Sequence, residues 1–446
     1  MCKRLISLLL TFMILFSLVS ITAMAAESVS NPRQLKTLGN QFVYEDDPTT
    51  AVRLTGVNVP GGEWTGTPQV EKIDRSVKWA IDNWDCNLIR LPVSVNGWTG
   101  NYSYVYDGGI GYKNYIDSVI QIANEKGAYV ILDLHHYRSF NNEQYLTFWQ
   151  EAATKYANNP AVLFGILNEP TGTPWEVWRD GDGDTITGHQ QVVEMIRDLG
   201  AKNIIVAGGL NYGYDLTGIA DGYALVDQGS NNDESKAGYG IAYDAHIYNH
   251  KGVTATNWDS KTGATRKQYP VIIGEFGWVN NSPAIGTLPV KDPDDPSLVE
   301  NWVPAILAWL DDDATYGSKA SYAAYCMHMT SEPPLIENDG NFKNDDYTYP
   351  PTEKWGAPIK AHLEQAVTTR YSKVVINYGN FDDDEDASID ASDLQLFKLH
   401  LKGKKLIKNH HCPAADLDGD GYVDTADLQE LKLYISKGRP FSVYKK

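Results

Sequence analysis

The chain has 446 residues and a formal net charge of −19 at pH 7. An acidic balance of this size repels phosphate backbones, so we exclude nucleic acid as a partner. Of the four cysteines, one lies at position 2, in the segment that we expect to be removed on export. Cys86, Cys326 and Cys412 remain, an odd number that indicates no disulfide framework. The length allows more than one domain. The 12 Trp and 27 Tyr residues are many for this length, and their rings suit a core or a surface that stacks on sugars.

The first residues have the pattern of an export signal. Lys3 and Arg4 precede an apolar run over residues 5–19, and Ala23-Met24-Ala25 offers small residues for cleavage. This is typical of a secretory signal peptide, to which we assign residues 1–26. We therefore expect a secreted, extracellular product. No later apolar run is long enough to span a bilayer, so we expect no membrane association.

Short apolar runs alternate with amphipathic stretches between residues 50 and 370. Near-continuous apolar strands are typical of parallel sheets covered on both faces. Eight strand-and-helix units are the number that closes into a (β/α)8 barrel, so we predict an α/β barrel domain over residues 27–370. The expected strands are Val52–Val57, Cys86–Pro92, Ala128–Leu134, Val162–Leu167, Asn203–Ala207, Ile241–Ala245, Val271–Gly274 and Ser321–Met327.

Polar residues lie at or just after the C-terminal ends of these strands, where such barrels carry their chemistry. Any one of them alone could be structural, as a paired arginine or a buried histidine. Matching positions on separate strands instead indicate a single site at the barrel mouth. The residues are Asn58, Arg90, His135, Asn168, Glu169, His246, Tyr248, Glu275 and His328.

Two of these residues are glutamates that end short apolar runs. Glu169 follows the fourth expected strand, and Glu275 follows the seventh. A buried strand that ends in a carboxylate is unfavourable unless the carboxylate is paired or functional. An opposed pair of carboxyl groups is the equipment for hydrolysis of glycosidic bonds, with retention or inversion depending on their separation. The sequence leaves that separation open.

The neighbouring strand ends suggest how the two glutamates differ. We expect Arg90 to keep Glu275 ionised as a nucleophile, and Tyr248 to donate a hydrogen bond to the same carboxylate. His246 is expected beside the other glutamate, where it would tune the affinity of that carboxyl group for its proton. Asn168 is placed to bond the 2-hydroxyl group of a sugar.

With these residues together, the region 40–365 resembles glycoside hydrolase family 5, a family of retaining (β/α)8 enzymes. The resemblance implies that Glu169 is the acid/base, that Glu275 is the nucleophile, and that catalysis needs no cofactor. It also implies a β-glucan polysaccharide substrate. The motifs that carry it are Leu54-Thr55-Gly56-Val57-Asn58, Ile89-Arg90-Leu91-Pro92, Asp133-Leu134-His135, Asn168-Glu169-Pro170, His246-Ile247-Tyr248 and Gly274-Glu275-Phe276-Gly277.

Within that family we expect an endo-β-1,4-glucanase. A β-mannanase, or a glucanase acting on xyloglucan or mixed-linkage glucan, is an alternative with the same catalytic residues. A second alternative is a catalytically inactive component that only binds carbohydrate, although the intact catalytic set argues against it.

The family usually places a tryptophan after the last strand to stack on the sugar at the cleavage point. Here that position reads Tyr325-Cys326-Met327-His328-Met329, with no tryptophan. Another ring could take its place, and the choice of substrate depends on it. We expect the sugar contacts, which could also be packing residues, among Asn58, Trp64, Trp98, Tyr137, Trp175, Trp178, Trp258, Trp278 and His328.

After a linker that we assign to residues 371–377, one acidic unit occurs twice with an offset of 34 residues. Oxygen ligands at positions 1, 3, 5, 7, 9 and 12 of a loop wrap Ca²⁺, and both copies have acids at five of these positions. Position 6 is Gly421 in the second copy and Ala387 in the first. The expected ligands are Asp382, Asp384, Asp386, Ser388, Asp390 and Asp393, and Asp416, Asp418, Asp420, Tyr422, Asp424 and Asp427.

A duplicated loop followed by one helix resembles a type I dockerin, which we assign to residues 378–440. The resemblance implies a small α-helical module that folds around two Ca²⁺ ions and docks onto a cohesin domain of a scaffoldin in a cellulosome. It places the cohesin contacts at Ala391 with Ser392 and at Thr425 with Ala426. These pairs differ between the copies, so two binding orientations need not be equivalent.

Overall fold

The computed structural model describes residues 32–61, 70–101, 108–279, 295–338, 346–373, 389–402, 407, 412–418 and 423–442. Several of our predictions lie outside these residues. They are the signal peptide, the candidate sugar contact Trp64, and the calcium ligands Asp382, Asp384, Asp386, Ser388, Asp420 and Tyr422.

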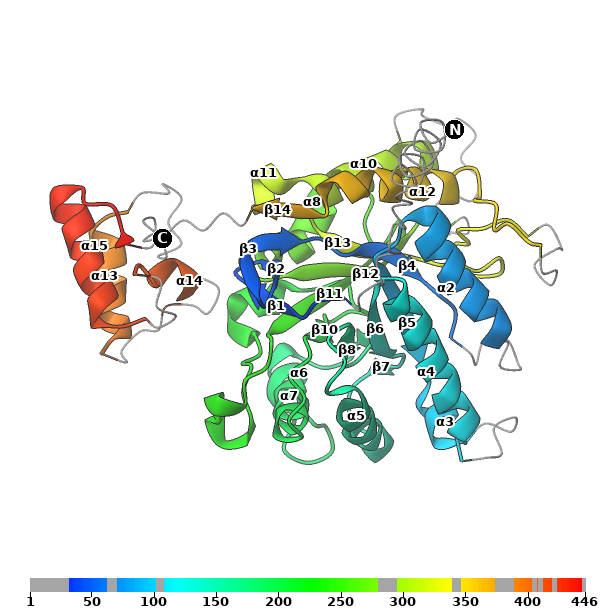
Figure 1. Ribbon diagram of the computed structural model, residues 1–446, viewed down its shortest axis with the longest axis horizontal. Helices are drawn as coiled ribbons and strands as arrows, with labels where there is room; N and C mark the ends of the chain where they lie inside the picture. The colour runs from blue at the N-terminus through cyan, green and yellow to red at the C-terminus, as the bar shows by residue number, and fades with distance from the viewer. Residues whose placement is uncertain are drawn as a thin grey trace, which may run out of the picture.

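Eight parallel strands form a closed barrel (Figure 1), which confirms the predicted fold class. Around the barrel the order is β10-β11-β12-β13-β4-β5-β6-β8, so consecutive strands of the barrel are neighbours. All eight expected strands are present, with ends that differ from the prediction by a few residues. Their bounds are β4 Thr55–Asn58, β5 Leu88–Val93, β6 Tyr129–Leu134, β8 Val162–Gly165, β10 Ile205–Gly208, β11 Ile241–Tyr248, β12 Val271–Gly277 and β13 Ser321–Ala324.

Helices surround the barrel and bury one face of each against it. In α5 the apolar residues Tyr145, Phe148, Trp149 and Ala152 recur at helical spacing and are buried, while Asn142 caps the first turn. The longer helices are α2 Val70–Trp84, α4 Ile110–Glu125, α5 Glu143–Tyr156, α7 His189–Asp198, α10 Val299–Asp311 and α12 Gly356–Ala366. Shorter ones are α3 Val95–Thr99, α6 Trp175–Asp180, α8 Ala255–Trp258, α9 Ala264–Gln268 and α11 Asp313–Tyr316.

A four-stranded antiparallel sheet packs on one end of the barrel. Its strands are β1 Leu35–Leu38, β2 Gln41–Tyr44, β3 Asp47–Val52 and β14 Tyr371–Lys373. Leu35, Phe42 and Val52 share an apolar cluster with barrel residues such as Leu88 and Ile272. β14 pairs with β3 from Thr50 to Val52. Our linker assignment at residue 371 therefore begins too early, because the first three of its residues complete this sheet.

In the described part of the C-terminal module, the helices are α13 Ala391–His400, α14 Cys412–Ala415 and α15 Thr425–Lys437. α13 and α15 each begin with an aspartate cap, Asp390 or Asp424, and a second aspartate three residues later completes a capping box. The helices enclose a core of their own around Phe397, Leu431 and Phe441. Among the described helices, none combines the length and apolar character needed to cross a membrane.

Candidate active site

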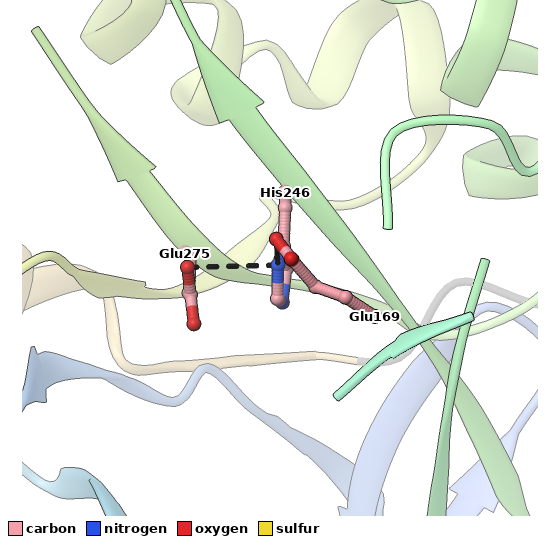
Figure 2. Close-up of side chains that lie close together, drawn as sticks. All are labelled: Glu169, His246 and Glu275. Atoms are coloured by element: carbon pink, nitrogen blue, oxygen red, sulfur yellow. Dashed lines mark hydrogen bonds and ion pairs between the residues drawn. The ribbon is translucent and has the colours of Figure 1, made fainter. Parts of the chain in front are cut away.

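Glu169, His246 and Glu275 converge at the barrel mouth (Figure 2), as the sequence predicted. His246 and Glu275 lie side by side on β11 and β12, where the register pairs them directly. Glu169 lies just beyond β8, in the two-residue strand β9 Glu169–Pro170, which pairs with β7 Tyr137–Arg138. One side-chain ligand atom from each of the three residues lies within 4.8 Å of the others.

Arg90 on β5 contacts this cluster through its guanidinium group. Its side chain is fully buried, and its Nη1 lies 2.7 Å from Oε1 of Glu275. The same guanidinium lies 3.2 Å from a carboxylate oxygen of Asp133 and 3.7 Å from one of Asp244. It also donates to Oδ1 of Asn168 at 2.6 Å. Nη1 also donates to Oδ1 of Asn58 at 3.0 Å. One buried cation therefore holds three carboxylates and two amides in fixed positions, as burial of a charge requires.

These contacts keep Glu275 ionised. Burial raises the pKa of its carboxyl group, but the charges of His246 and Arg90 outweigh burial, and the net pKa lies well below the usual range. The hydroxyl group of Tyr248 donates to Oε2 of Glu275 at 2.7 Å. The predicted contacts of Arg90 and Tyr248 with this carboxylate are therefore present.

Glu169 has a different environment. Its side chain is 23% exposed, against 6% for Glu275. Nδ1 of His246 lies 3.0 Å from Oε1 of Glu169, and Nε2 lies 3.3 Å from Oδ2 of Asp244. Burial lowers the pKa of His246, but the charges of Glu275 and Asp244 reverse the effect and raise it. A charged imidazole donates from both nitrogens, which fits these two carboxylate partners.

Two acidic residues of this network escaped the sequence reasoning. Asp133 lies 2.8 Å from Nδ1 of His135, and Asp244 accepts the backbone N–H of Gly274 at 2.7 Å. Both are buried and both contact Arg90. Each stands two residues before a predicted site histidine on its strand. That spacing was the available signal, because residues two apart on a strand point to the same face.

The structure corrects several predicted sugar contacts. Asn58 is fully buried and donates to the backbone carbonyls of Gly274 and Ala323. Three of the tryptophans lie in the core, with their indole N–H groups bonded to protein acceptors, so they cannot stack on a ligand. They are Trp98, Trp178 and Trp258.

The other described candidates remain available. Tyr137 is 50% exposed, and Trp175, Trp278 and His328 are partly exposed. Trp175 packs edge-on against the buried Trp178. Tyr325, which immediately follows β13, is partly exposed too, and its ring lies edge-on to Tyr248 at 6.2 Å. A ring therefore lies beside Tyr248 at the position where the expected tryptophan is missing.

Among the residues that the structure describes, two groups of side chains have the spacing of metal ligands. In the barrel, both nitrogens of His246 are directed at carboxylates and its pKa is raised, so the imidazole has no lone pair to offer. In the C-terminal module, carboxylate oxygens of Asp416, Asp418 and Asp427 lie within 4.8 Å of one another. Burial raises the pKa of Asp427. An all-oxygen set with a buried acid fits a hard cation such as Ca²⁺.

The comparisons with protein families cover both parts of the chain. The family model "Cellulase (glycosyl hydrolase family 5)" matches residues 45–304, which is more than half of the chain. The model "Dockerin type I domain" matches residues 380–436.

Curated relatives are endoglucanases. Endoglucanase N of Pectobacterium atrosepticum is 27% identical over 208 residues, which are 46% of this chain and 43% of that protein. Endoglucanase A of Butyrivibrio fibrisolvens is 27% identical over 238 residues, which are 51% of this chain and 49% of that protein. The chain thus spans less than half the length of these curated relatives.

Solved structures share the barrel fold. A beta-glucanase of Saccharophagus degradans has a TM-score of 0.55 at 24% identity, covering 76% of this chain and 95% of that one. The catalytic domain of a Thermobifida fusca endoglucanase has a TM-score of 0.54 at 18% identity, covering 74% of this chain and 97% of that one.

The depressed pKa of Glu275 predicts a pH dependence of stability. The folded state keeps this carboxylate ionised at pH values where the unfolded chain binds a proton. The contribution of Glu275 to the free energy of unfolding is therefore present above the unfolded pKa of about 4.3 and is lost as the pH falls toward the folded pKa. Each unit by which the two pKa values differ corresponds to about 1.4 kcal/mol. Urea unfolding between pH 2 and 6 should show that the free energy of unfolding of Glu275→Gln falls less steeply with decreasing pH than that of the unmodified chain.

Glu300→Gln is the matched control, because Glu300 is exposed on α10 and bonded to Lys354. Its free energy of unfolding should depend on pH as steeply as that of the unmodified chain. An equally steep dependence for Glu275→Gln would contradict the ionised state that we assign to Glu275.

Proposed function

We propose that this chain, which belongs to glycosyl hydrolase family 5 and carries a type I dockerin domain at residues 380–436, hydrolyses internal β-1,4 bonds of a glucan with retention. We further propose that it is exported through residues 1–26 and mounted on a cellulosome scaffold. The endoglucanase relatives and the neighbouring beta-glucanase structure support the choice of substrate class.

The spacing of the two catalytic carboxyl groups carries the proposed mechanism. A carboxylate oxygen of Glu169 lies within 4.8 Å of one of Glu275. Retaining enzymes hold the two groups about 5–5.5 Å apart, whereas inverting enzymes need about 6.5–9.5 Å to admit a water molecule between them. The short separation therefore favours a covalent intermediate over direct attack by water.

In the first step Glu275 forms a bond to the anomeric carbon while the glycosidic C–O bond breaks and Glu169 gives its proton to the leaving oxygen. In the second step Glu169 takes a proton from water, the water oxygen bonds to the anomeric carbon, and Glu275 leaves. Arg90 and Tyr248 hold the attacking oxygens. Because Oδ1 of Asn168 accepts from Arg90, its Nδ2 is left to donate to the sugar 2-hydroxyl.

Substitution of either glutamate tests these roles. Glu169→Gln should lower kcat on cello-oligosaccharides by about 10²–10⁴-fold, the usual contribution of a general acid/base, and Glu275→Gln should abolish formation of the covalent intermediate. Glu143→Gln, an exposed glutamate at the start of α5, is the control and should keep full activity. Proton NMR of the first products should show the β-anomer. First products in the α-configuration would refute double displacement, and full activity of either active-site variant would refute the assigned roles.

The ring after the last strand bears on the choice of polysaccharide. We propose that Tyr325 supports the sugar at the cleavage point in place of the usual tryptophan, since it lies beside Tyr248.

Reducing-sugar release should be highest on carboxymethylcellulose, compared with mannan, xyloglucan and lichenan. Tyr325→Ala should raise KM more than Tyr325→Trp does. A preference for mannan, xyloglucan or lichenan would favour the corresponding alternative enzyme. No activity on any of the four, with cohesin binding intact, would favour an inactive carbohydrate-binding component.

For the C-terminal module, which we place at residues 378–440, we propose two bound Ca²⁺ ions and a cohesin partner. The second loop would use Asp416, Asp418 and Asp427 together with Asp420, Tyr422 and Asp424, and the first loop the corresponding residues from Asp382 to Asp393. The four proposed cohesin contacts support this reading, because all are exposed in the first turns of α13 and α15. They are Ala391, Ser392, Thr425 and Ala426.

Removal of calcium should separate the two activities of the chain. Treatment of the full chain with a chelator should abolish cohesin binding, because the clustered carboxylates repel each other without a cation, and leave hydrolysis unchanged. Added Ca²⁺ should restore binding, and Asp427→Ala should weaken it at saturating calcium. Calorimetry should count two ions per chain. Cohesin binding that survives the chelator would contradict the calcium dependence.

A further inference from the structure

Lys251 is a partly buried cation beside Glu169 and Glu275 that none of the roles above uses. It follows β11 in a tight turn, in which its backbone N–H donates to the carbonyl of Tyr248 at 2.9 Å. Its side chain is only 16% exposed, and Nζ lies 3.8 Å from Oε1 of Glu169. Nζ also donates to the backbone carbonyl of Tyr212 at 2.6 Å.

This placement is unfavourable for an ammonium group. Burial lowers the pKa of Lys251, and the charges of Glu169 and Glu275 act in the opposite direction without cancelling the effect. The backbone that receives it is constrained as well, because Asn211 and Tyr212 both have positive φ, which non-glycine residues rarely adopt. A partly buried charge and a constrained backbone at the same contact point to a function rather than to packing.

The contacts of Glu169 show what that function is. His246 and Lys251 both approach the same oxygen, Oε1. The other oxygen, Oε2, has no hydrogen bond or ion pair within the part of the chain that the structure describes. The hydrogen bond from His246 and the nearby charge of Lys251 both act on Oε1. They leave Oε2 as the oxygen that carries the proton and fix the direction in which it is delivered.

We propose that Lys251 is a positioning residue that, with His246, holds Oε1 of Glu169 so that Oε2 donates its proton to the leaving group. The proposal rests on the proposed role of Glu169 as acid/base. Tyr212 takes part through its carbonyl oxygen, which ties the ammonium to the loop after β10, and the N–H of Tyr212 donates to Pro170, the neighbour of Glu169.

Leaving-group dependence tests this role. A dinitrophenolate leaves without a proton, whereas a sugar alkoxide needs one. For Lys251→Met we expect kcat/KM on cellotetraose to fall about 10- to 100-fold, the effect of a misplaced catalytic group. On 2,4-dinitrophenyl β-cellobioside it should change less than about twofold, because kcat/KM reports the first step only. Lys251→Arg should recover part of the loss.

Lys261→Met is the matched control, since Lys261 also pairs with a carboxylate, that of Asp215, and is partly exposed. This variant should leave kcat/KM unchanged on both substrates. Equal losses on both substrates for Lys251→Met would assign Lys251 a structural role, and no loss on either would refute any role. Glu169→Gln serves as the reference. If that variant does not discriminate between the leaving groups, the acid/base assignment itself fails; if it does and Lys251→Met does not, only the present inference fails.

Discussion

The guanidinium of Arg90 is the charge on which the rest of the site depends. It lies fully inside the barrel mouth, where an unpaired cation would be strongly destabilising. Glu275 and two aspartates compensate it, but three carboxylates exceed one guanidinium. The balance comes from His135 and His246, whose pKa values are raised although burial alone would lower them. The array is therefore close to neutral only while both imidazoles hold protons, so packing of the barrel and protonation of the site are linked.

This arrangement explains why two glutamates in contact with one histidine can differ in chemistry. Glu275 is part of β12 and faces Arg90, so its ionised form is the one that the surrounding charges stabilise. Glu169 lies outside the barrel strands on the short β9, with more of its side chain exposed and, among the described residues, no guanidinium paired with it. Such a carboxyl group can exchange its proton with substrate and water, as the proposed acid/base role requires. The difference follows from which element carries each residue.

The sequence predicted much of this geometry because strand periodicity and the position of strand ends are local properties. Eight apolar runs located the strands, and the barrel then required their polar ends to meet. The sequence could not distinguish rings that stack on a sugar from rings in the core. Trp98 and Trp178 have the same amphipathic side chain as a sugar-binding tryptophan and differ only in where their helices pack. Nor could it locate β14, whose three residues become a strand only by pairing with β3, more than 300 residues away in sequence. Asp133 and Asp244 were missed because a lone aspartate within an apolar run has no periodicity of its own.

The two modules neutralise clustered carboxylates in different ways. In the barrel, Arg90 and His246 belong to the chain, so the acidic side chains are compensated as soon as the strands pair. In the C-terminal module, the described hydrogen bonds to Asp427 come from neutral backbone amides, those of Leu417, Asp418 and Asp424. Amides orient a carboxylate but do not remove its charge, and the small core around Phe397 and Leu431 provides little additional stabilisation. If the module binds Ca²⁺ as proposed, the ion supplies the compensating charge and couples the fold of the module to the metal.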